Sequence, residues 1–160
     1  MLALVLSGLI LTGVMTTFVT VLKSSLRLWN YEQMERQTNT GLEYFARDAR
    51  MAKTISWGSP TSITLTVPRA DGSADRTAIY SWDNATKIFS KTEGGVVTPL
   101  VKDVQSFAFD RYNLVQGSAA NDFETKQIQI TMTALPPTNH IIVDSSKRVF
   151  SARFVLRNKG

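Results

Sequence analysis

The chain has 160 residues, no cysteine, and a formal net charge of +5 from 18 basic and 13 acidic residues. The lack of cysteine excludes a disulfide scaffold and a thiolate metal site, and the length suits one domain, alone or preceded by a helical stalk. The basic residues are scattered, with no run of five like charges, so a nucleic-acid-binding surface has little support.

The first 22 residues form an uninterrupted apolar segment. Met1 to Leu22 contains no charged residue and no proline. As a helix rising about 1.5 Å per residue, the segment would extend roughly 33 Å, which is enough to cross a hydrocarbon core of about 30 Å. No basic residue precedes it, and it is longer than the apolar core of a signal peptide. A membrane-spanning helix is therefore favoured over a cleavable signal.

Small residues recur along this apolar segment. Gly8, Thr12, Thr16 and Thr20 follow one another at intervals of four, and Gly13 lies beside them. On a helix this spacing makes a slowly winding stripe. Small side chains let another helix approach closely, and hydroxyls can bond across such a contact. We predict that these five residues form the surface through which subunits assemble, although glycine and threonine are also simply common in membrane helices.

Residues 23–53 continue the helix in amphipathic form. Apolar residues recur there at the i, i+3, i+4, i+7 spacing of a helix face, and they are Leu42, Phe45, Ala46, Ala49 and Ala52. We expect this face to pack on a following sheet, with the charged residues, Asp48 among them, largely off it. Gly41 weakens the helix by about 1 kcal/mol relative to alanine, and it marks either a bend or a close contact. Trp29 and Tyr31 suit a membrane interface, or ordinary packing against a neighbour.

After residue 53 the apolar period changes to two, which is typical of half-buried strands. The expected strands, separated by turns rich in glycine, proline, aspartate and asparagine, lie within residues 62–67, 77–82, 87–91, 96–98, 101–112, 126–135 and 148–157. The Pro136-Pro137 pair should end the strand before it. No strand–helix–strand alternation occurs, so we predict an α+β fold: an N-terminal helix over residues 1–53 and an antiparallel sheet head over residues 54–160.

Catalytic and metal-binding patterns are not found. The single histidine, His140, lies in an expected loop with no nucleophile or carboxylate nearby. The segment Asp71 to Asp75 has the opening of a calcium loop without its sixth-position glycine or closing glutamate, so a hairpin tip is favoured. We predict a non-enzymatic protein with no cofactor, no metal and no small-molecule substrate.

An apolar helix that runs straight into an amphipathic helix and then a sheet resembles the type IV pilin-like proteins. Residues 1–8, MLALVLSG, look like the stretch that follows the N-terminal glutamate in that family. Residues 61–65, 78–83 and 100–109 follow the order seen in minor pilins and in J-type minor pseudopilins of type II secretion. The resemblance implies one pass through the bacterial inner membrane, a head domain in the periplasm or outside the cell, and assembly with other pilin-like subunits through helix packing.

Two features depart from the family pattern. The family begins with a leader and a Phe-Thr-Leu-x-Glu element, whereas the first acidic residue here is Glu32, so we expect residues to precede Met1. Lys23 and Arg27 follow the span and by the positive-inside tendency favour a cytoplasmic head, but we follow the resemblance. The predicted function is a structural minor subunit of a type II secretion pseudopilus or a type IV pilus. The alternative is a membrane-anchored extracytoplasmic binding module that uses the helix only as a tether.

Overall fold

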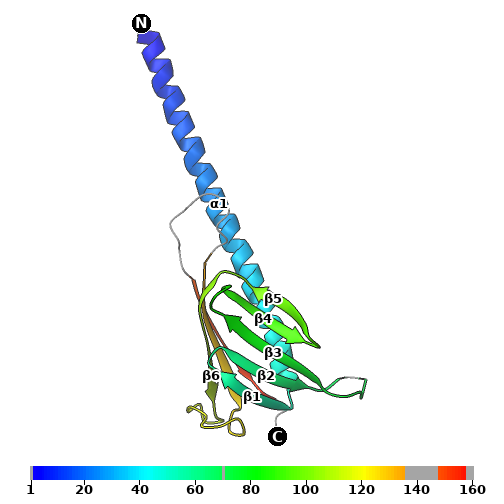
Figure 1. The fold of residues 1–160 in the computed structure, drawn as a ribbon. Helices are drawn as coiled ribbons and strands as arrows, with labels where there is room; N and C mark the ends of the chain where they lie inside the picture. Colours follow the sequence, from blue (N-terminus) through cyan, green and yellow to red (C-terminus); the bar gives the residue numbers. More distant parts are fainter. Residues whose placement is uncertain (1, 70, 136–147, 158–160) are drawn as a thin grey trace.

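The computed structural model describes residues 2–69, 71–135 and 148–157, and these form one helix followed by eight strands (Figure 1). The helix α1 spans Leu2–Met51 and leads directly into the head. The strands are β1 Thr54–Ser59, β2 Ser62–Val67, β3 Arg76–Asp83, β4 Ile88–Glu93, β5 Val96–Val101, β6 Val104–Tyr112, β7 Gln127–Ala134 and β8 Arg148–Val155. The predicted α+β organisation is confirmed. The expectations for Pro136-Pro137 and His140 lie outside the described residues.

The strands form two antiparallel sheets. One sheet has the order β1-β2-β3-β4-β5 and the other the order β6-β7-β8. Tight turns join the strands of the larger sheet: Gly94 and Gly95 have φ values of 59° and 83° between β4 and β5. Asp83 caps the β3–β4 turn by accepting hydrogen bonds from the Ala85 amide and the Thr86 hydroxyl. Both connections are therefore short hairpins, because their residues satisfy the local backbone demands.

The C-terminal part of α1 packs against both sheets. The structure buries Phe45, Ala46, Ala49 and Ala52 and half-buries Leu42 against the core. The ring centroid of Phe45 lies 5.0 Å from that of Tyr80 on β3, 5.7 Å from Phe109 on β6 and 5.2 Å from Phe154 on β8. One helical side chain thus contacts both sheets, which fixes the helix at the place where the two sheets meet.

Gly41 marks the closest approach of the helix to the larger sheet. A Cβ atom at this position would lie 2.8 Å from Cγ2 of Val101 and 3.3 Å from Cβ of Leu100, both on β5. Such a distance is inside van der Waals contact, so glycine lets the helix backbone lie directly on the end of β5. The glycine serves a close contact rather than a bend, since α1 continues without interruption to Met51.

Candidate functional site on the projecting helix

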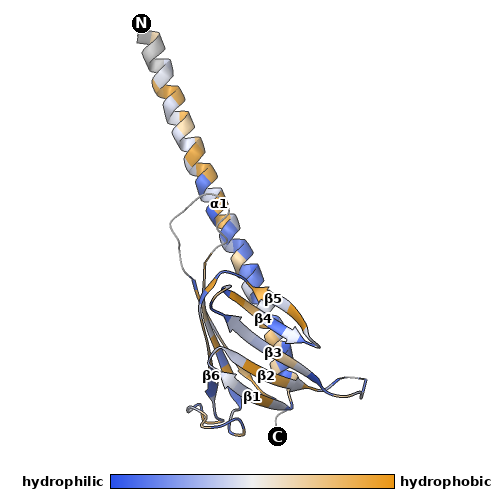
Figure 2. Cartoon of the chain, viewed as in Figure 1, coloured by the Kyte–Doolittle hydropathy of each residue, from blue (hydrophilic) through white to orange (hydrophobic). Residues whose placement is uncertain are grey.

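The N-terminal half of α1 projects away from the head (Figure 1), and residues 7–29 are all exposed. Orange and pale bands alternate along the described part of this half (Figure 2), and the first charged residue in the sequence is Lys23. The exposed large apolar residues there are Leu9, Ile10, Leu11, Val14, Met15, Phe18, Val19, Val21 and Leu22. Within the described residues, this is the one helix long and apolar enough to cross a membrane. The surface is therefore suited to lipid or to other helices.

The row of threonines and basic residues on the projecting half lies on the side of the helix that carries the head. Residues 18 apart are related by about five full turns and share one face. Thr16, Thr20, Lys23 and Arg27 are each 18 residues before a buried residue, and those buried residues are Met34, Thr38, Gly41 and Phe45. The row therefore lies on the same face that the head covers, about 27 Å nearer the N-terminus.

The opposite side of the projecting half is formed by large apolar side chains. Ile10, Val14, Phe18 and Val21 are each 18 residues before an exposed residue, and those exposed residues are Leu28, Glu32, Arg36 and Asn39. A shallow depression of about 580 Å³ lies on this side, lined by these four residues together with Gly13 and Thr17. The apolar face made by these four residues therefore lies on the side away from the head, and further exposed apolar residues, Leu11, Met15, Val19 and Leu22, continue around the helix. Gly13 forms a notch at the edge of the depression nearest the threonine row.

The five residues expected to form one packing stripe share one side of the helix, since at 100° per residue they lie within an arc of about 140°. Thr12, Thr16 and Thr20 follow the head side, and Gly13 lies between them and the apolar depression, which it also lines. Gly8 has open space around its Cα, with no atom within 4 Å of a Cβ built there. The stripe therefore lies largely on the side that carries the head.

The threonine hydroxyls of the stripe already donate within the helix. Thr12, Thr16 and Thr20 each donate to the carbonyl oxygen four residues earlier, at 2.8 Å. Thr17 does the same to Gly13 at 2.9 Å. A neighbouring helix would therefore find acceptor lone pairs and close approach on this stripe, rather than hydroxyl protons awaiting a partner.

A buried carboxylate on the packed half of α1 was not expected from the sequence. Asp48 is fully buried, so the expectation that it lies off the buried stripe is wrong. It forms ion pairs with Arg76 on β3 and, at 2.8 Å, with Lys91 on β4, and it accepts a 2.7 Å hydrogen bond from the Tyr80 hydroxyl. Its place three residues after Phe45 is a helix-face spacing that could have revealed it.

With Glu93 included, this cluster contains two carboxylates and two basic side chains. Its carboxylate pairs with Arg76 at 2.8 Å and with Lys91 at 2.6 Å. Each charge thus has an opposite partner within the cluster, which joins α1 to β3 and β4. Balanced, mutually satisfied charges of this kind hold elements in one register and offer no activated group for chemistry.

The ionisation of the cluster follows from these contacts. Burial is the largest influence on Asp48 and would raise its pKa, but hydrogen bonds from Arg76, Lys91 and Tyr80 together outweigh burial and hold that pKa below its ordinary value. The hydrogen bond from Lys91 likewise lowers the pKa of Glu93. Burial, and then the bond to Asp48, raise the pKa of the Tyr80 hydroxyl. Both carboxylates are therefore ionised at neutral pH.

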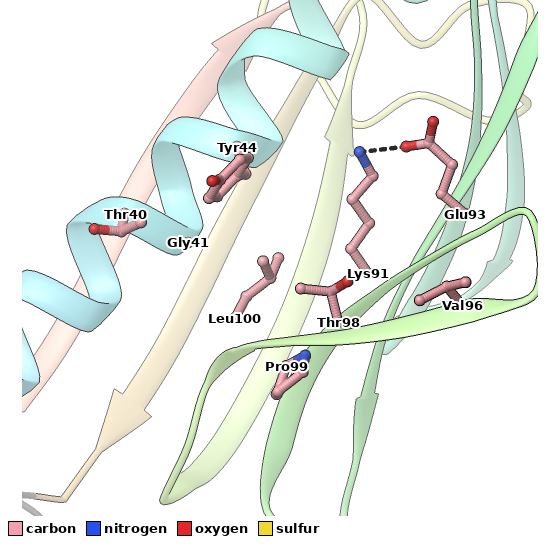
Figure 3. A pocket seen from close by; sticks show the side chains of 9 residues that line it. All are labelled: Thr40, Gly41, Tyr44, Lys91, Glu93, Val96, Thr98, Pro99 and Leu100. Carbon is pink, nitrogen blue, oxygen red and sulfur yellow. Dashed lines mark ion pairs between the residues drawn. The ribbon is translucent and has the colours of Figure 1, made fainter.

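A cavity of about 330 Å³ lies beside the cluster, between α1 and β5 (Figure 3). It is lined by Thr40, Gly41, Tyr44, Lys91, Glu93, Val96, Thr98, Pro99 and Leu100. The ammonium of Lys91 is turned to Glu93, as the dashed line in Figure 3 shows. No group of three or more potential metal ligands occurs among the described residues.

No known protein-family model matches this chain, and no curated protein matches it either. The long apolar N-terminal helix followed by antiparallel sheets is compatible with a pilin-like architecture.

Proposed function

We propose that the chain is a structural subunit of a pilin-like filament, held in a membrane by its helix before assembly. The finer form of the proposal is a minor subunit of a type II secretion pseudopilus or of a type IV pilus. Its partners are other pilin-like subunits that pack helix against helix, and its head lies in the periplasm or outside the cell.

The observation that carries this proposal is the position of the apolar face relative to the head. Large apolar side chains nearly encircle the projecting half, as a tether in lipid would also need, but the threonine row lies on the side that carries the head. In a bundle of parallel helices with the heads outside, the side of each helix opposite its head faces the other helices. Ile10, Val14, Phe18 and Val21 supply large apolar side chains on that side.

The attachment of the head supports the same function. The helix runs from the projecting half into the packed half without a break, and Phe45 and the Asp48 cluster fix its rotation against both sheets. A contact made on one face of the projecting half therefore sets the direction in which the head points. A flexible tether would not need this coupling.

A leucine at Gly13 tests the assembly proposal. The substitution fills the notch of the apolar face and should reduce recovery of the chain in sheared filaments at least tenfold, because close helix approach is lost. The matched control, Met15→Leu, conserves volume on the same segment and should assemble normally. Thermal unfolding of the full chain in detergent should be the same for both variants. Normal assembly of Gly13→Leu would favour the alternative of a binding module with a simple tether.

A further inference from the structure

Residues 113–126 connect β6 to β7, and residues 113–125 of this connection, called here the distal loop, expose three large apolar side chains. Leu114, Val115 and Phe123 are 77%, 82% and 78% exposed, more than any large apolar side chain described on the helix. Large apolar groups left in solvent outside a membrane segment mark a site of protein contact. The loop lies at the end of the head opposite the N-terminus (Figure 1).

The distal loop is ordered by its own hydrogen bonds. The Asn113 amide donates to the Gly117 carbonyl at 2.8 Å, and the Gly117 amide donates to the Asn113 side chain at 2.9 Å. Asp122 accepts from the Trp57 amide on β1 and pairs with Arg111 on β6, both at 3.0 Å. The backbone that carries the apolar side chains is thus held in place before binding, which lowers the ordering cost of a contact.

The distal loop also carries negative charge. Asp122 has Arg111 as its cation, whereas Glu124 accepts hydrogen bonds from neutral donors, the Ala120 amide and the Asn121 side chain. Lys126 follows the loop and lies over the ring of Phe123, 5.9 Å from its centroid. The loop therefore offers a carboxylate at Glu124 beside an apolar cluster.

Residues 22–29, the segment of α1 just N-terminal to the part that the head covers, are called here the neck. Their composition complements that of the distal loop. Lys23 and Arg27 lie on its head side and, among the described residues, form no ion pair with a carboxylate. Leu22, Leu26 and Trp29 form an exposed apolar row beside them at i, i+4, i+7 spacing. The neck thus offers two cations beside an apolar row, and the distal loop offers the Glu124 carboxylate beside exposed apolar side chains.

We propose that the distal loop of one copy docks on the neck of a second copy. The second copy is displaced along the helix axis in the direction from the N-terminus to the head. The inference rests on the proposed filament and identifies a contact within it. If the apolar faces pack inwards, Lys23 and Arg27 of the displaced copy point outwards, on the N-terminal side of its own head. The distal end of the first copy's head then reaches them, with Glu124 against the two basic residues and Phe123 against the apolar row. Such a head-to-tail contact uses two different surfaces and propagates without closing.

Disulfide cross-linking of the full chain tests this contact, since the natural sequence has no cysteine. A chain carrying Val115→Cys together with Leu26→Cys, assembled into filaments and oxidised, should give a ladder of linked oligomers. Either single variant should give at most a weak dimer band. The control pair, Leu26→Cys with Ile79→Cys on β3, should give no ladder. Absence of the ladder in well-formed filaments, or links to other subunits alone, would overturn the proposed contact.

Charge variants separate this contact from mere proximity. Glu124→Gln keeps the hydrogen-bond acceptor for the Ala120 amide but removes the charge, and it should lower the cross-linking yield about two- to fivefold. Glu124→Lys should lower it further, and adding Arg27→Glu to Glu124→Lys should restore it. A yield independent of these charges would contradict the docking mode. Failure of the proposed function is a separate outcome, because then no filaments contain the chain at all.

Discussion

At the scale of single residues, Asp48 shows how the head is locked to its helix. A fully buried carboxylate is costly to desolvate, and here Arg76, Lys91 and Tyr80 compensate that cost from two neighbouring strands. The partners lie far along the chain from Asp48, so its residue type suggested solvent exposure. Only the helix-face spacing from Phe45 pointed the other way.

Replacing Asp48 with asparagine should destabilise the head strongly. The variant leaves Arg76 and Lys91 with Glu93 as their one remaining anion in the cluster, and loss of one buried partner costs about 3–5 kcal/mol. Urea unfolding of the full chain in detergent measures the loss. Asp75→Asn is the control, because it breaks an exposed pair with Lys53 at 3.0 Å that is worth at most about 1 kcal/mol. Equal effects of the two substitutions would refute the locking role.

The same cluster predicts a loss of stability in acid. Asp48 and Glu93 have pKa values lowered by folding, so their ionised forms stabilise the native state at any pH above the ordinary carboxyl value of about 4. That contribution is lost as the pH falls through the lowered values. The urea midpoint should stay level from pH 7 to about pH 5 and fall below about pH 4, less steeply in Asp48→Asn. A midpoint that rises on acidification would exclude this account.

At the scale of elements, much of the architecture was predictable. The alternation in residues 62–67 and 126–135 predicted β2 and β7. The glycine and aspartate turns predicted the hairpins of the larger sheet. Strand β1 was missed because Gly58 lies within Thr54–Ser59 and Pro60 follows it, and both residue types are typical of a loop. The division into the sheets β1-β2-β3-β4-β5 and β6-β7-β8 was also missed, because the apolar period of a strand does not specify which strands pair.

The contact between α1 and β5 predicts a specific sensitivity at Gly41. Leucine there cannot fit without moving Val101 and Leu100, and overpacking of this kind costs about 1–3 kcal/mol or more. The loss should appear as a lower melting temperature of the full chain in detergent. Asn39→Leu, two positions earlier on an exposed part of the helix, should change it little. An unchanged or raised melting temperature in Gly41→Leu would mean that the helix does not lie on β5 so closely.

At the scale of the whole molecule, the sequence predicted a projecting helix but not how its faces are oriented. The small-residue stripe was identified by spacing alone, whereas its direction relative to the head depends on which residues the sheets bury. Met34, Thr38, Gly41 and Phe45 supply that direction, and they place the apolar face on the side away from the head. A subunit of this shape can place its helix in a shared core while its head remains outside.

A cysteine scan of the projecting helix tests this arrangement most directly. Single cysteines at residues 9 to 22 are introduced into the full chain, which has none of its own, and the assembled chains are oxidised. We predict that disulfide-linked dimers peak at Ile10, Val14, Phe18 and Val21, with a period of about 3.6 residues, and fall to a minimum at Thr16 and Thr20. A scan with no periodicity, or with its maximum on the threonine side, would contradict a core built from the apolar face.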